Sequence, residues 1–186
     1  METPDQKWSR IYSQGRDFRL ISSQEIDSFL AYLPANSPKT CLDIGCGTGQ
    51  LSRELFHRGL TVTGIDASAN AIKRAAQLTV HPNLSYIHLD IEQATTSQLA
   101  HPASYGLITC KLVYAFIQNK PAFLEKVRGL LNPNGIFVVI TPRVDDVEPD
   151  KRAIAVDDSA IHLLEKTFKK VTLYTEKGLS YFIGVN

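Results

Sequence analysis

The segment from Cys41 to Gly49, which reads Cys-Leu-Asp-Ile-Gly-Cys-Gly-Thr-Gly, limits the folds open to this chain more than any other segment. A short apolar run leads into three glycines at alternate positions, and a helix-like pattern follows at once. Glycine lets the backbone turn tightly and lets a ligand approach it closely. Strand, glycine turn and helix in this order predict the entry unit of a nucleotide-binding α/β domain.

Two residues of this region indicate which ligand the loop serves. The dinucleotide fingerprint G-x-G-x-x-G requires a glycine at the position where this chain has Gln50. Asp43 places a carboxylate two residues before the first glycine, where it would repel a pyrophosphate and attract a cation. S-adenosylmethionine carries an ammonium and a sulfonium group and no phosphate, so it fits this charge pattern. The alternative is an ordinary strand-to-helix turn.

The same residues resemble the first motif of the class I S-adenosylmethionine-dependent methyltransferases, which reads hydrophobic, acidic, hydrophobic, Gly-x-Gly-x-Gly. Residues 42–49 match this motif in full, and the resemblance covers about residues 24–186. It implies an α/β fold with a Rossmann-like, doubly wound, seven-stranded sheet that is mostly parallel and ends in an antiparallel hairpin. It also implies S-adenosyl-L-methionine as the cofactor and S-adenosyl-L-homocysteine as the product.

The rest of the chain alternates between short apolar runs and amphipathic segments, which predicts strands joined by helices. Ser22 to Glu25 forms a capping-box pattern that begins a helix before the first strand. Asn132 to Gly135 predicts a turn in which Asn134 tolerates a positive φ, and a charged loop is expected over 141–152. The predicted strands cover about 40–44, 61–65, 84–89, 105–110, 136–140, 171–175 and 179–185.

The expected organisation is one compact unit, with an N-terminal helical lid or extension over 1–34 and a methyltransferase domain over 35–186. The chain departs from the family pattern at Tyr105-Gly106, because the fourth strand often begins with an aromatic residue and an aspartate. The turn before the fifth strand is usually Pro-Gly-Gly, and here it is Pro133-Asn-Gly. Neither departure touches the predicted cofactor contacts.

Composition gives no positive signal for several classes of partner. The chain has 186 residues and a net charge of +1, so no broad electrostatic signal favours nucleic acid or an anionic membrane. Residues 1–7 lack an apolar signal segment, and the longest apolar run is too short to cross a bilayer, so a cytoplasmic protein is expected. The three cysteines and five histidines lack metal-ligand or disulfide spacing, so no metal is expected. The oligomeric state stays open.

Predicted cofactor contacts lie at the carboxyl ends of the strands, where ligands of open parallel sheets bind. Asp66 could accept hydrogen bonds from both ribose hydroxyls, and the resemblance assigns it the same role. The resemblance places Asp90 near the adenine amine, and Asp43 would reach the methionine ammonium. As an alternative, each aspartate could serve as a helix cap or turn former. The other predicted contacts are Gly45, Cys46, Gly47, Gly49, Ala67, Ile91 and Lys111.

Substrate contacts are expected from the N-terminal segment, the stretch after the fourth strand and the charged loop. Aromatic residues near the N-terminus suggest a lid, and two arginines could meet an acidic group. The candidates are Trp8, Tyr12, Arg16, Tyr114 and Arg143. The alternative is that the arginines lie at the surface and that Tyr114 packs on the following helix. No catalytic residue is assigned, because methyl transfer depends mainly on positioning the nucleophile.

The leading hypothesis is a methyltransferase that acts on a small molecule by in-line displacement. The alternatives are an RNA or protein methyltransferase and a non-catalytic S-adenosylmethionine-binding protein. An Asn/Asp-Pro-Pro-aromatic motif, which grips planar amino groups in DNA-adenine enzymes, is absent after the fourth strand, where the chain reads Lys111-Leu-Val-Tyr114. A dehydrogenase is disfavoured by both Gln50 and Asp43.

Overall fold

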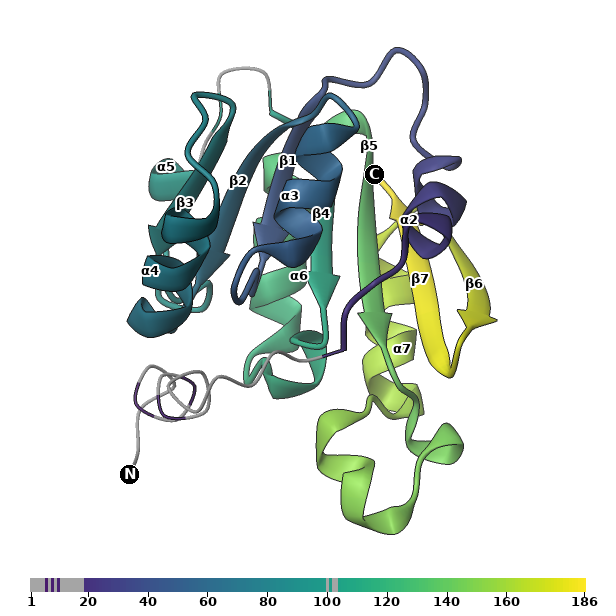
Figure 1. Cartoon of the computed structure of the whole chain (residues 1–186). Coiled ribbons are helices and arrows are strands. Elements are labelled where there is room, and N and C mark those ends of the chain that lie inside the picture. Colours follow the sequence, from purple (N-terminus) through teal and green to yellow (C-terminus); the bar gives the residue numbers. More distant parts are fainter. Residues whose placement is uncertain (1–5, 7, 9, 11–18, 100, 102–103) are drawn as a thin grey trace.

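Short apolar runs joined by amphipathic helices form a seven-stranded sheet with the order β3-β2-β1-β4-β5-β7-β6 (Figure 1). The computed structural model describes residues 6, 8, 10, 19–99, 101 and 104–186. Strands β1 to β5 are parallel, whereas β7 is antiparallel to both β5 and β6. The predicted fold class is therefore confirmed. The strands are β1 Thr40–Ile44, β2 Thr61–Asp66, β3 Leu84–His88, β4 Tyr105–Lys111, β5 Leu131–Thr141, β6 Lys170–Glu176 and β7 Leu179–Val185.

Strands β1 and β4 lie at the centre of the sheet and are buried, as expected for parallel strands covered by helices on both faces. The register places Ile44 at the end of β1 opposite Ile65 of β2 and Cys110 of β4. The carboxyl ends of these strands are therefore level with one another. Residues at and just after these ends consequently meet at one edge of the sheet, called here the carboxyl edge.

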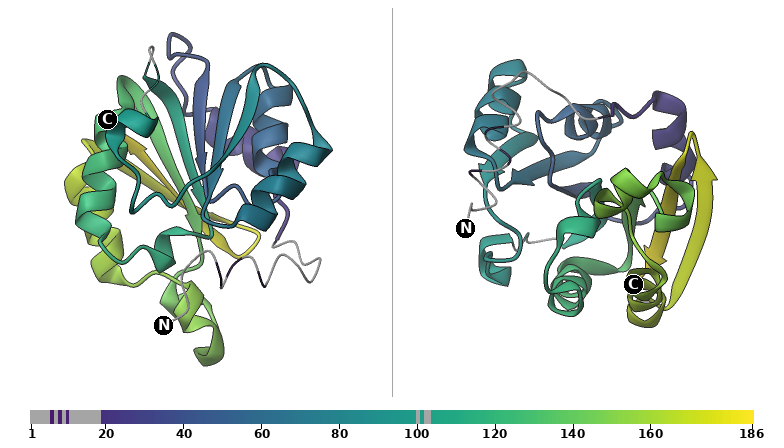
Figure 2. Two further views of the ribbon diagram at one scale, coloured as in Figure 1. Left: turned by 90° about the vertical axis from the view of Figure 1, so that its left-hand side faces the viewer. Right: turned by 90° about the horizontal axis from the view of Figure 1, so that it is seen from below.

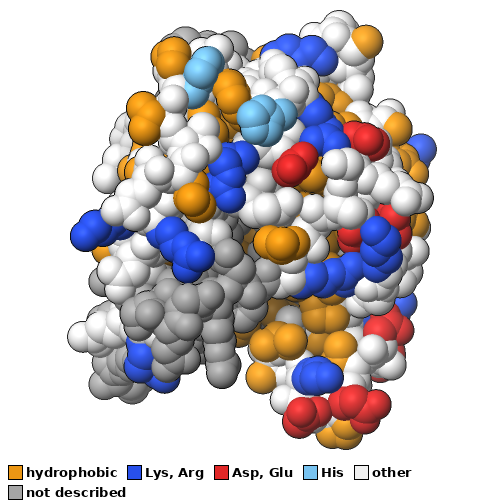
Figure 3. All heavy atoms as spheres, viewed as in Figure 1, with side chains coloured by type: hydrophobic (Ala, Val, Ile, Leu, Met, Phe, Trp, Pro, Cys, Tyr) orange, Lys and Arg blue, Asp and Glu red, His pale blue; other side chains and the backbone are white. Residues whose placement is uncertain are grey.

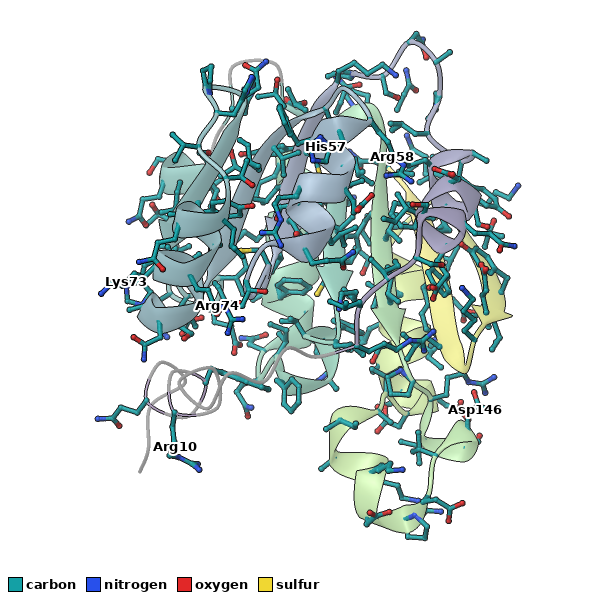
Figure 4. All side chains as sticks on the ribbon, in the orientation of Figure 1. Arg10, His57, Arg58, Lys73, Arg74 and Asp146 are labelled. Carbon is teal, nitrogen blue, oxygen red and sulfur yellow. The ribbon has the colours of Figure 1, made fainter. Side chains whose placement is uncertain are left out.

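Helices cover both faces of the sheet (Figure 2). On one face lie α2 (Ser23–Leu30), α3 (Gln50–His57) and α4 (Ala69–Leu78), and on the other lie α5 (Thr96–Leu99), α6 (Lys120–Leu130) and α7 (Asp158–Thr167). Phe29 of α2 and Leu55 of α3 belong to one buried cluster, and Leu124 of α6 belongs to the other. Arg58, at the end of α3, reaches toward α2 and pairs with Asp27 at 2.8 Å (Figure 4).

Side-chain caps begin most of these helices. Ser22 and Glu25 form the predicted capping box, with each side chain bonded to the other residue's backbone N–H. Ser68 caps α4, and Asp157 caps α7. These caps satisfy amide groups that the first turn of a helix leaves without an intrahelical partner.

The turn predicted at Asn132 to Gly135 lies inside β5, at its irregular start, and does not precede the strand as expected. The N–H of Asn134 donates to Oδ1 of Asn132 at 3.2 Å, which bends the chain inside the strand. The pairing with β4 shifts register at the same level. Asn134 does not adopt the positive φ expected of it.

Gly106 stands where the family often has an acidic residue, and its surroundings explain the departure. A Cβ on Gly106 would collide with the carbonyl oxygen of Pro38. The N–H of Gly106 also donates to Oγ1 of Thr40 at 3.3 Å. Close packing of two backbones therefore requires glycine here. The position is at the amino end of β4, remote from the carboxyl edge.

The charged loop predicted over 141–152 contains regular structure. Thr141 still belongs to β5, and two short 3₁₀ helices follow, η2 (Val144–Asp146) and η3 (Pro149–Ile154). Backbone bonds close the base of this segment, from Val144 N to Val156 O at 2.9 Å and from Val156 N to Pro142 O at 3.0 Å. Residues 143–156, called here the excursion, project beyond the carboxyl edge (Figure 1).

The predicted lid over 1–34 stays a prediction, because most of residues 1–18 lie outside the described part of the chain. Its described end contains α2, which packs on the same face as α3. Among the helices that the structure describes, none is both long and apolar enough to traverse a bilayer.

Glu25 is a buried carboxylate that joins α2 to β7 and to the chain before α2. Its oxygens accept hydrogen bonds from Tyr181 Oη at 2.7 Å, from Arg19 Nη2 at 2.9 Å and from Ser22 Oγ at 2.7 Å. Lys177, in the β6–β7 turn, lies 3.4 Å away. Burial alone would raise the pKa of Glu25, but the hydrogen bonds from Ser22, Tyr181 and Lys177 outweigh burial and lower the pKa to about 2.

We expect Glu25→Gln to lower the free energy of unfolding by about 2–3 kcal/mol, because it removes charge-assisted bonds at a buried site. Urea unfolding at neutral pH measures the change. The matched control is Glu54→Gln, which removes a more exposed pair with Arg58. That variant should cost about 0.5 kcal/mol or less.

The pH dependence provides a second test of the same site. Because the folded pKa of about 2 lies below the ordinary value of 4.5, ionised Glu25 adds its full stability above pH 4.5. The advantage of the wild type over Glu25→Gln should shrink as the pH falls from 4.5 toward 2. An advantage that stays constant over this range would contradict the assignment.

Candidate functional site

A cavity of about 610 Å³ lies at the carboxyl edge of the sheet. Residues at the ends of β1, β2 and β3 form one side, which carries carboxylates and is called here the polar wall. Residues after β4, residues of the excursion and Leu20 form the other side, which we call the apolar wall. The polar wall includes Asp43, Gly45, Cys46, Gly47, Asp66, Ala67, Asp90 and Ile91, and the apolar wall consists of Leu20, Leu112, Val113, Phe116, Ile117, Ala153 and Ile154.

The glycine loop turns the chain from β1 into α3 and is bonded to β2. Its three glycines have φ values of 67°, 55° and 78°, a region that favours glycine. The N–H groups of Gly45 and Cys46 donate to the carbonyl of Ile65 at 2.8 and 3.0 Å, and that of Gly47 donates to Asp66 Oδ2 at 2.8 Å. A pyrophosphate would therefore find these donors engaged and a carboxylate beside them. The loop is not built as a phosphate cradle.

The glycines also allow close packing around the loop. A Cβ on Gly45 would collide with the side chain of Val113, so the polar and apolar walls touch at this point. A Cβ on Gly49 would collide with the ring of Tyr86. Gly49 caps α3 and is not among the described residues that line the cavity, so its contact with the cofactor stays a prediction.

Asp43 is buried in the polar wall, where it connects three elements. Ser52 of α3 donates to its Oδ2 at 2.6 Å, and Thr109 of β4 donates to its Oδ1 at 2.8 Å. Burial raises the pKa of Asp43, and the two hydroxyl donors act against this effect. The side chain therefore holds the start of α3 against the centre of the sheet.

Asp66 ends β2 and lies in the polar wall beside Ala67. Its Oδ1 accepts from the N–H of Ser68 and its Oδ2 accepts from the N–H of Gly47, both at 2.8 Å. Burial raises the pKa of Asp66, while the bonds from Ser68 and Gly47 lower it. A carboxylate oxygen can accept more than one hydrogen bond, so Asp66 can hold the loop and still accept from a ligand.

Asp90 and Ile91 form a turn after β3 that α6 holds in place. Oδ1 of Asp90 accepts from the N–H of Glu92 at 2.9 Å. Lys126 of α6 donates to the carbonyl of Ile91 at 2.7 Å, and the Glu92 carboxylate accepts from the N–H of Asn119 at 2.9 Å. The predicted adenine contacts therefore sit on a turn fixed from both sides.

Residues 19–22, called here the N-terminal strap, pass beside the cavity and are held by two wall residues. Gln50 Oε1 accepts from the N–H of Ile21 at 3.2 Å, and Gln50 Nε2 donates to the carbonyl of Ile21 at 3.0 Å. The ammonium of Lys111 donates to the carbonyl of Arg19 at 2.8 Å. Lys111 thus lines the cavity and also holds the strap, while its contact with the cofactor stays a prediction.

The structure describes only part of the predicted substrate site. Trp8 lines the cavity, and its ring meets that of Phe116 edge-on with centroids 5.0 Å apart. Tyr12 and Arg16 lie outside the described residues, so their contacts stay a prediction.

Two predicted substrate contacts lie away from the lining of the cavity, and their roles stay predictions. Tyr114 is buried in the core, and its hydroxyl donates to the carbonyl of Ala160 at 3.1 Å. Arg143 lies at the base of the excursion, with Asp145 and Asp158 each 3.8 Å from Nη2. Neither side chain lines the 610 Å³ cavity. Tyr114 follows β4 in a 3₁₀ turn, η1 (Tyr114–Phe116), which directs its ring into the core.

Several residues that line the cavity were not predicted from the sequence. At Gln50 the sequence shows only that a glycine is missing, and the pairing of Gln50 with the strap depends on a contact between segments far apart in the chain. Leu112 has a φ of 59°, which no pattern of side chains signals at a non-glycine residue. The other cavity-lining residues that were not predicted include Arg19, Leu20, Thr48, Glu92, Val113, Phe116, Ile117, Gln118, Ala153 and Ile154.

Comparison with known proteins matches residues 35–178 to the methyltransferase domain family. The ubiquinone biosynthesis O-methyltransferase of Psychrobacter cryohalolentis is 30% identical over 59% of this chain and 47% of its own length. The mitochondrial ubiquinone biosynthesis O-methyltransferase of Schizosaccharomyces pombe is 37% identical over 56% of this chain and 38% of its own length. The chain therefore spans less than half the length of these curated relatives.

The fold also matches solved structures. The plantazolicin methyltransferase BamL, in complex with a triazolic desmethylPZN analog and SAH, superposes with a TM-score of 0.71. The match covers 92% of this chain and 71% of the other at 22% identity. At this level of identity, the likeness concerns the fold alone.

We expect Gln50→Ala to loosen the N-terminal strap, because both backbone groups of Ile21 lose their side-chain partner. Amide hydrogen exchange at Ile21 should become roughly tenfold faster, which corresponds to about 1.4 kcal/mol. The control is Gln98→Ala, which removes a side chain bonded to Thr95 near α5 and should leave Ile21 unchanged. Equal protection of Ile21 in Gln50→Ala and the wild type would contradict this role of Gln50.

Proposed function

The chain belongs to the methyltransferase domain family, and from this premise we propose that it methylates a small-molecule acceptor bound along the apolar wall of the cavity. S-adenosylmethionine is the methyl donor in this proposal, which the match to the methyltransferase domain family and the O-methyltransferase relatives support. The observation that carries the proposal is a cavity with two chemically different walls. Its volume of about 610 Å³ falls in the range of about 300–1,000 Å³ typical of small-molecule sites.

The polar wall fits S-adenosylmethionine better than it fits a nucleotide phosphate. The loop N–H groups are engaged within the chain, and carboxylates stand beside them. Asp66 would accept hydrogen bonds from the ribose hydroxyls, and Asp43 would favour a cationic amino acid group. Asp90 and Ile91 would hold the adenine on their fixed turn. When bound, S-adenosylmethionine supplies an electrophilic methyl group on a sulfonium centre.

Neither a histidine nor a thiolate among the described residues of this cavity offers itself as a general base. Among the described residues that line the cavity, none is a histidine. Cys46 lies in the polar wall, but burial raises the pKa of its thiol well above the usual range, with Asp43 and Asp66 adding to the effect. The thiol is therefore neutral. An acceptor that ionises by itself or carries a neutral lone pair suits such a site, because positioning then supplies most of the rate.

Two further observations support a small acceptor. Both curated relatives are named O-methyltransferases of ubiquinone biosynthesis, which favours an oxygen nucleophile on a small molecule. On the face shown in Figure 3, Lys and Arg side chains are interspersed with acidic, polar and hydrophobic ones. A nucleic-acid substrate would favour a contiguous basic stripe instead.

We expect Asp66→Asn to weaken the binding of S-adenosylhomocysteine by more than tenfold, because the ribose hydroxyls lose a charged acceptor. Isothermal titration calorimetry measures the affinity, and thermal unfolding verifies that the variant is folded. The control is Glu125→Gln on α6, whose exposed carboxylate pairs with Arg128 and should leave the affinity unchanged. No binding to folded wild-type protein would contradict the proposed cofactor site.

Methyl transfer from labelled S-adenosylmethionine provides the test of the acceptor class. We expect the label to enter molecules of an ultrafiltered small-molecule extract with the wild type, and to enter far less with Asp66→Asn. Separate reactions with RNA and with protein serve as comparisons. Transfer that requires RNA or protein would contradict a small-molecule acceptor.

A further inference from the structure

Exposed apolar side chains surround the outer part of the cavity. Leu20 of the strap is 60% exposed and Ile154 of the excursion is 44% exposed, although both line the cavity. The half-buried rings of Trp8 and Phe116 meet edge-on at the same cavity. We call Leu20, Ile154, Trp8 and Phe116 the apolar rim. They come from segments far apart in the sequence, so the fold brings them together.

Further apolar side chains of the same cavity lie closer to the glycine loop. Ile117 is buried, Val113 is half-buried, and both line the cavity between the rim and the glycine loop. Val113 packs against Gly45, which places the inner end of the apolar wall beside the polar wall. An apolar path therefore leads from the glycine loop to the surface. Hydrophobic side chains also gather where the excursion faces the body of the protein (Figure 3).

The cations Arg19 and Lys111, which also line the cavity, are already used by the chain. Arg19 pairs with Glu25 at 2.9 Å, and Lys111 donates to the carbonyl of Arg19 at 2.8 Å. They hold the strap in place, and the surface beside them is apolar. Exposed apolar surface of this kind is unfavourable in water and often marks a ligand-binding groove.

We propose that the acceptor is an amphiphile, with a compact nucleophilic head enclosed near Val113 and an apolar chain that leaves the cavity across Leu20 and Ile154. This inference rests on the proposed function and adds the class of acceptor to it. The wall near Gly45 encloses the head group of the ligand, while the exposed rim covers only one side of the ligand's apolar tail. A tail longer than the cavity can thus bind without a deeper pocket.

The experiment uses 4-n-alkylphenols from methyl to octyl as probes, each below its critical micelle concentration. Isothermal titration calorimetry measures their affinity for the full chain with and without S-adenosylhomocysteine. We expect the affinity to rise roughly two- to fourfold with each added methylene, because each methylene buries apolar surface at the rim. Affinity that does not depend on chain length would overturn the inference.

Substitutions at the rim locate the effect. Ile154→Ser and Leu20→Ser should each weaken octylphenol binding by roughly tenfold and leave methylphenol binding unchanged. Ile154→Leu should keep the affinity. The matched control is Leu173→Ser, because Leu173 is 45% exposed and lies on the edge strand β6. An equal loss in Leu173→Ser would overturn the assignment to the rim.

The alkylphenol series also distinguishes a failure of the cofactor site from a failure of the apolar rim. If S-adenosylhomocysteine does not bind, but the affinity for alkylphenols still rises with the length of the alkyl group and depends on Ile154, the apolar site stands and the cofactor site fails.

Analytical ultracentrifugation tests whether a second copy of the protein covers the rim. If Ile154→Ser dissociates a wild-type dimer and leaves octylphenol affinity unchanged, the rim is an interface between copies and the inference is overturned.

Discussion

The attachment of the glycine loop to β2 is the interaction on which the rest of the site depends. The loop donates two N–H groups to the carbonyl of Ile65 and one to the carboxylate of Asp66. These bonds fix the point at which the chain leaves β1 and enters α3. They also leave the loop with a carboxylate on its ligand side instead of a row of unpaired donors. The proposed preference for S-adenosylmethionine over a phosphate-bearing nucleotide therefore rests on backbone bonding as much as on the charge of Asp43.

Two buried carboxylates stabilise the elements that carry the glycine loop and the N-terminal strap. Asp43 accepts from Ser52 of α3 and Thr109 of β4, so one side chain connects the first helix of the unit to two central strands. Glu25 similarly connects α2 to β7 and to Arg19 of the strap. A buried carboxylate is costly unless its oxygens are bonded, and both have several donors. The strap thus has a rigid support although it lies at the edge of the cavity.

In the proposed function, the two walls of the cavity have different roles, one toward the methyl donor and one toward the acceptor. The polar wall consists of strand ends and turns held by hydrogen bonds, such as the Asp90 turn that Lys126 fixes from α6. The apolar wall comes from the strap, from the segment after β4 and from the excursion. A rigid polar wall suits a common methyl donor, whereas walls built from connecting segments can vary with the acceptor.

Sequence alone determined the order of the elements and most of the polar wall, because both depend on residues close together in the chain. The motif around Asp43 and the strand-end aspartates are local patterns, and a parallel sheet brings such strand ends to one edge. Tertiary structure decided the rest. In the folded protein, Gly49 packs against Tyr86 and Tyr114 is buried in the core. Arg143 lies away from the cavity. Leu20 and Ile154 line the same cavity only because the strap and the excursion, far apart in the sequence, both lie at the carboxyl edge, and no local pattern encodes that arrangement.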